Sequence, residues 1–154
     1  MQSTFASGMH AVVVETDPDT AEIKILRYCV VHDCGNLINP RIVEGQIHGG
    51  VAQGVGGALY ERMAYDDAGQ LQNASFMDFL MPYITEVPDT IEIDHLVTPS
   101  PLNPLGIKGA GEAGVIPGAA AIASAIEDAE GITITSMPIS PTELFDLRRQ
   151  KESS

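Results

Sequence analysis

A glycine-rich helix constrains the fold of this 154-residue chain more than any other feature of its sequence. Asn39 followed by Pro40 is a typical helix start, because asparagine caps free N–H groups and proline is tolerated at the first helical position. Apolar or small side chains then keep a helical spacing to about Met63. Six glycines interrupt this run: Gly45, Gly49, Gly50, Gly54, Gly56 and Gly57. Since an interior glycine costs up to ~1 kcal/mol relative to alanine, we expect other atoms to approach this backbone closely.

The segments around this helix predict a small mixed sheet. Residues 10–32 are typical of a β-hairpin, since two runs of β-branched and alternating apolar residues flank the turn sequence TDPDT. Residues 71–82 and 91–98 are predicted to be strands or extended segments, and residues 132–138 a short strand.

Two further helices are predicted in the C-terminal third. Residues 118–131 are rich in alanine, and Gly131 is placed as a C-terminal stop. Ser140 and Glu143 have the spacing of a capping box at the start of a helix over 140–150. Because no internal repeat or linker divides residues 1–154, we expect one α+β unit.

Composition restricts the partners and the compartment. Eight basic against 21 acidic residues give a formal net charge of −13, so the surface should repel nucleic acid and anionic membranes. No stretch approaches the ~18 apolar residues of a membrane-spanning helix. The two cysteines, Cys29 and Cys34, do not form the framework of a small secreted protein. We therefore expect a cytoplasmic chain.

The first candidate site lies in the sequence EGQIHGGVAQGVGG, where Gln46 stands among glycines such as Gly45 and Gly49. A glutamine amide offers donors and an acceptor in one plane, which suits the heteroatom edge of a flat cofactor. Close helix packing through small residues is the alternative, and pattern alone favours it. A dinucleotide fingerprint is excluded, because GVGGAL ends in Leu59 and lies inside a helix.

The second candidate site is KGAGEAG, residues 108–114, where Glu112 projects from a glycine-rich backbone. Desolvation there would raise the pKa of the carboxyl group toward the range of a general base. The alternative is a glycine-rich loop with a solvated glutamate. A nucleotide-binding P-loop is excluded, because Lys108 precedes the glycines and no GK[ST] follows.

His32, Asp33 and Cys34 form a third candidate, for metal binding or for a hydrolase with a thiol nucleophile. Consecutive residues on a strand point to opposite faces, so these three side chains should not converge on one centre. A structural turn is favoured. His10, His48 and His95 show no metal-ligand spacing, and no metal ligand is predicted.

Taken in order, VVHDCGNLINPRIVEGQIHGGVAQGVGGALYE, ASFMDFLMP, TPSPLNPLGIKGAGEAG and the alanine-rich helix resemble a known family. They are similar to the C-terminal portion of the molybdenum-binding large subunit of the xanthine dehydrogenase, aldehyde oxidase and aerobic carbon monoxide dehydrogenase family. The resemblance covers nearly the whole chain. It is strongest for the bacterial carbon monoxide dehydrogenase-like branch, through HDCG, EGQIHGG and SFMDF.

The resemblance implies a molybdenum-cofactor-binding domain that holds molybdopterin, in its cytosine dinucleotide form in most bacterial members. It also implies that Glu112 is the catalytic glutamate, which takes a proton from the hydroxyl group that attacks an electron-poor carbon. The substrate class is an aldehyde, an N-heterocycle or carbon monoxide. The residues implied to contact the cofactor are Gly45, Gln46, Gly49, Lys108, Gly109, Ala110 and Gly111.

The family subunit is several times longer than this chain, and the cysteine loop of true carbon monoxide dehydrogenases is missing. The resemblance therefore implies that the remainder of the large subunit lies on another chain, with iron–sulfur and flavin subunits as further partners. Because one half of a site cannot exclude water, we expect the isolated chain to be inactive. The alternative is a non-catalytic truncated remnant or assembly module that retains the fold.

Overall fold

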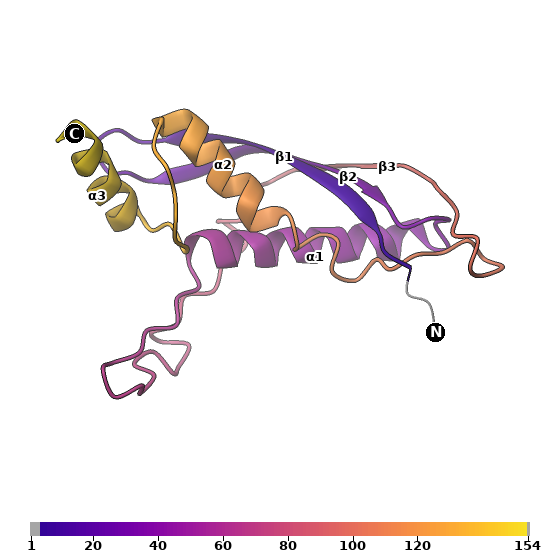
Figure 1. Cartoon of the computed structure of the whole chain (residues 1–154), viewed down its shortest axis with the longest axis horizontal. Helices are drawn as coiled ribbons and strands as arrows, with labels where there is room; N and C mark the ends of the chain where they lie inside the picture. Colours follow the sequence, from indigo (N-terminus) through magenta and orange to yellow (C-terminus); the bar gives the residue numbers. More distant parts are fainter. Residues whose placement is uncertain (1–3, 154) are drawn as a thin grey trace.

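A computed structural model describes residues 4–153 of the chain (Figure 1). Three helices and a three-stranded sheet follow one another along these residues. They are β1 (Ser7–Thr16), β2 (Ile23–Asp33), α1 (Pro40–Leu59), β3 (Ile91–His95), α2 (Gly118–Glu130) and α3 (Pro141–Glu152). The strand order is β1-β2-β3, with β1 antiparallel and β3 parallel to β2. The predicted α+β class with a mixed sheet is confirmed.

The predicted hairpin forms because its turn is closed by a side chain. Asp17 Oδ1 accepts hydrogen bonds from the backbone N–H groups of Asp19, at 2.9 Å, and Thr20, at 2.7 Å. This Asx-type turn sets the register that pairs Thr16 with Ile23. As expected, β2 is the strand that carries the chain toward the glycine-rich helix.

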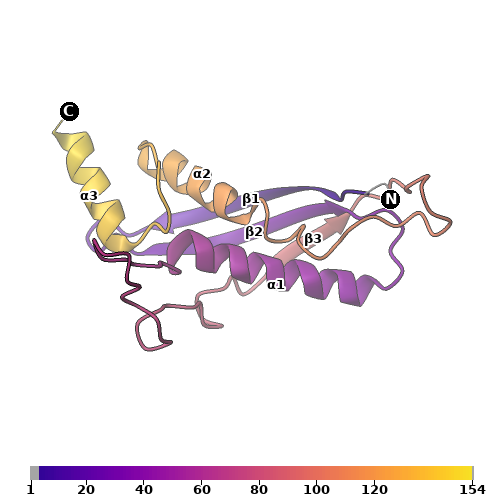
Figure 2. The same cartoon turned by 60° about the horizontal axis from the view of Figure 1, so that its bottom comes forward.

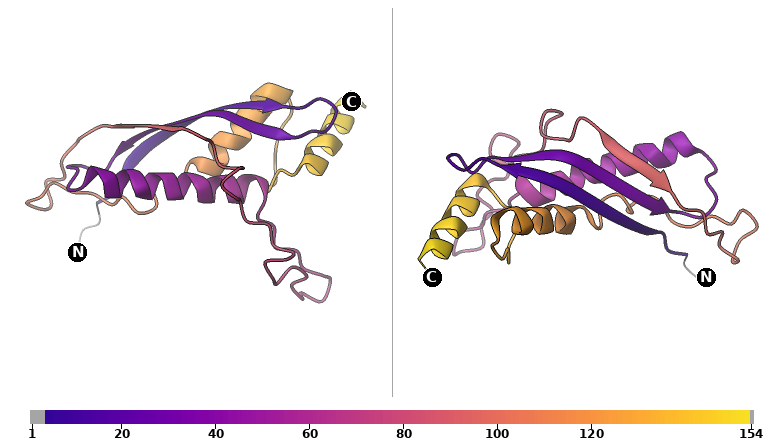
Figure 3. Two further views of the ribbon diagram at one scale, coloured as in Figure 1. Left: turned by 180° about the vertical axis from the view of Figure 1, so that it is seen from behind. Right: turned by 90° about the horizontal axis from the view of Figure 1, so that it is seen from above.

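The hydrophobic core lies between one face of the sheet and helices α1 and α2 (Figure 2). Tyr28 and Val30 of β2 are fully buried there against aliphatic side chains of both helices. Those aliphatic residues include Ile47, Val51, Val55, Ile122 and Ile126. The opposite face of the sheet has no helix over it among the described residues (Figure 3). Met9 and Leu26 accordingly remain more than half exposed on that face.

Helix α1 begins where the sequence predicts, since Asn39 Oδ1 accepts a hydrogen bond from Ile42 N and Pro40 occupies the first turn. It ends at Leu59 rather than at the predicted Met63. The N–H groups of Tyr60 and Glu61 both donate to the carbonyl of Gly56, at 2.9 and 2.8 Å, which turns the chain out of the helix. The six glycines all lie within α1.

Two predicted extended segments are wrong. Residues 71–82 form turns instead of a strand, because the N–H groups of Asp78 and Phe79 both donate to the carbonyl of Ser75. Residues 132–138 also form no strand, since Ile134 N donates to the Glu127 side chain rather than to a neighbouring strand. The predicted strand over 91–98 is confirmed in its first part, as β3.

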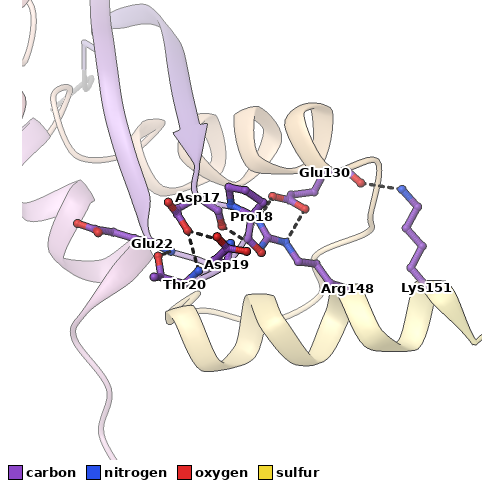
Figure 4. Close-up of polar contacts among 8 residues, drawn as sticks. All are labelled: Asp17, Pro18, Asp19, Thr20, Glu22, Glu130, Arg148 and Lys151. Carbon is purple, nitrogen blue, oxygen red and sulfur yellow. Dashed lines mark hydrogen bonds and ion pairs between the residues drawn. The ribbon is translucent and has the colours of Figure 1, made fainter.

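Helix α3 is fixed to the rest of the molecule by Arg148 (Figure 4). Its guanidinium donates to both carboxylate oxygens of Glu130, at 2.9 and 2.6 Å, and to the carbonyl of Asp17 at 2.9 Å. Lys151 Nζ donates to the Glu130 carbonyl at 2.7 Å. The predicted capping box of Ser140 and Glu143 is present at the start of α3. These contacts join α3 to the end of α2 and to the hairpin turn.

Candidate functional site

The loop that carries Glu112 is packed directly on α1. A Cβ atom built on Gly50 would lie 2.6 Å from the carbonyl carbon of Gly114, and one built on Gly114 would lie 2.9 Å from the Cα of Ile47. Two backbones therefore touch where neither residue carries a side chain. Two peptide steps of about 3.8 Å place the Cα of Glu112 within roughly 12 Å of the Cα of Ile47.

The glycines of α1 separate into two groups with different surroundings. Gly50 and Gly54 face the chain itself, and a Cβ on Gly54 would lie 3.2 Å from the Cα of Gly118 at the start of α2. A Cβ on Gly45, Gly49 or Gly57 would meet nothing within 4 Å among the described residues. Close packing within the chain thus explains the first group only.

In the sequence Gln46 lies between two of these open glycines, Gly45 and Gly49, and it is exposed, as they are. Gln46 is therefore next to two positions of α1 that carry no side chain. Glycine at these two positions does not allow closer packing among the described residues. Such a face allows a flat ligand or another backbone to reach the main chain of α1. Of the predicted contact residues on α1, Gly45, Gln46 and Gly49 are therefore all accessible from outside the described chain.

Glu112 itself is exposed to solvent. Its carbonyl accepts the N–H groups of Val115, at 3.0 Å, and Ile116, at 3.2 Å, so its backbone is held in a turn. A Cβ on Gly111 would meet nothing within 4 Å. The desolvated setting expected for a general base is not formed by residues 4–153 alone, since the walls that would exclude water are not among them.

Lys108 is held by a partner inside the chain. Its Nζ lies 3.2 Å from Asp33 Oδ2, and only 16% of the Lys108 side chain and 9% of the Asp33 side chain are exposed. Asp33 also accepts hydrogen bonds from the hydroxyl of Thr98 and, at 2.8 Å, from Gly35 N. The Thr98 and Gly35 hydrogen bonds, with the Lys108 ammonium, hold the pKa of Asp33 well below its ordinary value.

This ion pair fixes the glycine-rich loop to the end of β2. Lys108 N donates to the Cys34 carbonyl at 2.7 Å, and Gly109 N donates to the Thr4 carbonyl at 3.3 Å. Lys108 therefore anchors the loop in the described structure. A cofactor that contacted the Lys108 ammonium would have to share it with the carboxylate of Asp33. Ala110 is half-buried beside this anchor.

The His32, Asp33 and Cys34 candidate does not have the properties of a nucleophilic centre. All three residues are buried. Burial raises the pKa of the Cys34 thiol, which disfavours the thiolate that a nucleophile needs. Since Asp33 is committed to Lys108 and Thr98, the segment is a structural corner between β2 and the loop.

Sequence reasoning missed a group of histidines on the inner face of the sheet, of which His32 is buried and His10 and His95 are half-buried. His10 Nδ1 lies 2.8 Å from the Tyr28 hydroxyl, and the rings of His32 and His95 lie edge to face with centroids 6.2 Å apart. Neither ring nitrogen of His32 has a hydrogen-bond partner. Burial lowers the pKa of His10 and of His32, which disfavours the charged form of both rings. His32 and His95 come together because they are paired on the adjacent strands β2 and β3, and this pairing cannot be predicted from the sequence pattern alone.

Within residues 4–153, no three or more His, Cys, Asp or Glu side chains are grouped so that they could hold a metal ion. Over the same residues no helix combines the length and the apolar character needed to cross a membrane.

The fold places the exposed Gln46 face of α1 and the Glu112 loop on the same helix. A family model described as "Molybdopterin cofactor-binding domain" matches residues 1–88, more than half of the chain. The chain belongs to this family. The family predicted from the ordered motifs is thereby confirmed.

Known relatives place this segment inside much larger proteins. The chain is 44% identical over 143 residues to the nicotine 6-hydroxylase large subunit of Paenarthrobacter nicotinovorans, covering 91% of the chain and 17% of that subunit. It is 40% identical over 126 residues to the carbon monoxide dehydrogenase large chain of Afipia carboxidovorans, covering 82% of the chain and 16% of the relative. The chain thus spans less than a fifth of either relative.

A solved structure shows the same fold. The chain superposes on quinoline 2-oxidoreductase from Pseudomonas putida 86 with a TM-score of 0.89 and 44% identity, over 94% of this chain and 19% of that one. The identities do not single out the carbon monoxide dehydrogenase branch, which the motifs had favoured.

Proposed function

We propose that this chain is the segment of a molybdenum hydroxylase large subunit that supplies the catalytic glutamate, Glu112, and part of the molybdopterin pocket. The reaction class is oxidation of an aldehyde, an N-heterocycle or carbon monoxide with water as the source of oxygen. The observation that carries this proposal is the open face of α1 around Gln46, with the Glu112 loop packed on the same helix through Gly50 and Gly114.

The residues that fit the cofactor are those whose backbone is accessible. Gly45 and Gly49 leave the main chain of α1 open on either side of the Gln46 amide, which has the donors and acceptor that a pterin edge requires. Residues 109–111 would pass beside the same group. When bound, molybdopterin supplies a molybdenum centre that accepts two electrons from the substrate. The cytosine dinucleotide form belongs to the proposal as well.

Glu112 would act through its carboxylate oxygens, which take up a proton from the attacking oxygen nucleophile. A base of this kind works best with a pKa near the working pH, which requires a dry environment. Since Glu112 is exposed in this chain, the remainder of the large subunit must supply that enclosure. We therefore propose that the isolated chain is inactive and that iron–sulfur and flavin subunits remove the electrons from the assembled enzyme. The free thiols of Cys29 and Cys34 are in keeping with a cytoplasmic assembly.

A reconstituted complex tests the function. The probe is the nicotine 6-hydroxylase large subunit with the 143-residue matched segment deleted, hereafter the complementary fragment, co-expressed with this chain and the remaining subunits of that enzyme. Glu112→Gln should keep the molybdenum content and reduce nicotine turnover at least ~100-fold, the range of general-base catalysis. Glu15→Gln, an exposed acid at the far end of β1, is the control and should change neither. Unchanged turnover in Glu112→Gln would remove the catalytic assignment.

The second candidate function is a non-catalytic remnant or assembly module. The solvent exposure of Glu112 favours it, because nothing among the described residues encloses the carboxylate. A complex that forms but binds neither molybdenum nor pterin would support this alternative.

A further inference from the structure

The segment between α1 and β3, residues 60–90, leaves the body of the molecule as an arm (Figure 1). Segments this long without helix or strand are uncommon in compact domains and are usually functional or disordered. This arm is ordered by its own hydrogen bonds. Asn73 accepts from Ala64 N at 2.9 Å and donates to the Arg62 carbonyl, while Asp66 Oδ1 accepts from the N–H groups of Ala68 and Gln70, each at 2.9 Å.

The root of the arm is fixed to α1. A Cβ built on Gly56 would lie 3.0 Å from Pro82 Cδ, so the returning half of the arm touches the helix backbone. A bridge between Tyr65 and Leu71 closes the outer half. The arm therefore has a defined shape and a defined starting point.

Three apolar side chains of the arm are almost fully exposed in the described structure. Phe76 is 84% exposed, Met77 91% and Ile84 87%. Residues 76–84 contain one charged residue, Asp78, whose carboxylate accepts a hydrogen bond from the Ser75 hydroxyl at 3.1 Å. Exposed apolar surface of this extent marks an interaction site.

The arm also contains an apolar hollow of about 360 Å³. Met63, Leu71 and Phe79 are among the residues that line it. Projecting aromatic and methionine side chains beside an apolar hollow can interdigitate with a partner surface, as the central residues of stable interfaces do. The arm thus offers both side chains to insert and a place to receive one.

Chain length and net charge indicate which kind of partner covers the arm. The superposed solved chain is about five times longer than this one, and the uncovered 6% of the present chain is too short to contain the arm. The arm is therefore part of the fold within a much larger chain. A second copy of this chain is disfavoured, because each copy carries a net charge of −13 and two copies repel.

We propose that the arm is the principal surface through which this chain docks on the remainder of a molybdenum hydroxylase large subunit. The partner surface is apolar and receives Phe76 and Met77. This inference rests on the proposed function, since the partner is the remainder of the same subunit. Truncation of two such anchors reduces the affinity of an interface at least tenfold.

Binding of the complementary fragment to this chain measures the role of the arm. Phe76→Thr combined with Met77→Thr should raise the Kd at least tenfold in a titration followed by light scattering. Both side chains are almost fully exposed, so the unfolding temperature of the isolated chain should stay unchanged. The matched control combines Met9→Thr with Leu26→Thr, which removes two exposed apolar side chains from the outer face of the sheet and should raise the Kd less than threefold.

The inference is overturned if the wild-type chain does not bind the complementary fragment, if the arm variant binds as tightly as the wild type, or if the control weakens binding as strongly. It is also overturned if the arm mediates only homodimers. Failure of the proposed function looks different, because a complex that depends on the arm but lacks molybdenum and pterin would leave the docking surface in place.

Discussion

Alanine substitutions at two adjacent glycines of α1 should change the stability of the chain in opposite directions. Gly49 and Gly50 have the same helical backbone, but they face different surroundings. A Cβ at Gly49 meets nothing within 4 Å, whereas one at Gly50 lies 2.6, 2.7 and 2.8 Å from backbone atoms of Gly114 and Val115. Neither backbone can move without opening the contact between the helix and the loop.

The magnitudes follow from helix propensity and overpacking. Gly49→Ala should stabilise the chain by about 1 kcal/mol, which raises the Tm by roughly 3 °C for a chain of this size. Gly50→Ala gains the same propensity but forces apart two packed backbones, a cost of about 3 kcal/mol at the upper end of overpacking. The net expectation is a loss of about 2 kcal/mol and a fall in Tm of roughly 6 °C.

Urea and thermal denaturation of the two variants, followed by circular dichroism, measures both values. Gly45→Ala, at another open position, serves as a second stabilising variant and should resemble Gly49→Ala. If Gly49→Ala and Gly50→Ala shift the Tm in the same direction, the division of the α1 glycines into open and packed positions is refuted.

Three further predictions concern buried ionisable groups. Asp33→Asn should lower the free energy of unfolding by about 2 kcal/mol, because it leaves the half-buried ammonium of Lys108 without a carboxylate partner. Urea denaturation measures this change. Equal stability of the variant and the wild type would show that the ion pair is unimportant. The pKa of His10 and of His32 is lower in the folded chain than in the unfolded chain, so the unfolded chain binds more protons below about pH 6.5. The free energy of unfolding should therefore be highest above that pH. It should fall by up to ~1.4 kcal/mol per pH unit per histidine as the pH drops toward 5. Denaturation at pH 7.5 and 5.5 measures this, and a flat profile would contradict it. Since burial raises the pKa of Cys34, iodoacetamide should label that thiol at pH 7 only after unfolding, as peptide mass spectrometry would show.

Local signals in the sequence predicted most of the elements. The Asn39–Pro40 start, the Gly131 stop and the Ser140 capping box all appear at the predicted positions. The two starts depend on side chains only a few residues from the backbone groups that they satisfy, and the stop depends on the left-handed backbone that Gly131 adopts, so each signal is local in the sequence.

The wrong segments depend on packing and side-chain contacts that their own composition does not indicate. Residues 132–138 have strand-like composition, but the Glu127 side chain takes the N–H group of Ile134, and no strand forms there. Residues 71–82 are apolar enough for a strand, yet the neighbours that would bury them are not among the described residues. The pattern of apolar and β-branched residues contains neither piece of information.

The candidate site was predicted in part for the same reason. The glycines indicated close approach, but only the fold separates those that meet Gly114 and Gly118 from those that meet nothing. The pairing of Lys108 with Asp33 joins residues 75 positions apart and could not be read from local spacing. Glu112 is exposed because the residues that would enclose its carboxylate are not among the described residues.

The most direct test of the central claim is the molybdenum and pterin content of the complex between the complementary fragment and chains that carry alanine or leucine at Gly49. A Cβ at Gly49 meets nothing within 4 Å among the described residues, so the complex should still assemble. If the open face of α1 holds the cofactor, Gly49→Leu should reduce molybdenum and pterin per complex at least tenfold, and Gly49→Ala should reduce them less. Full loading of the Gly49→Leu complex would contradict the proposed cofactor site.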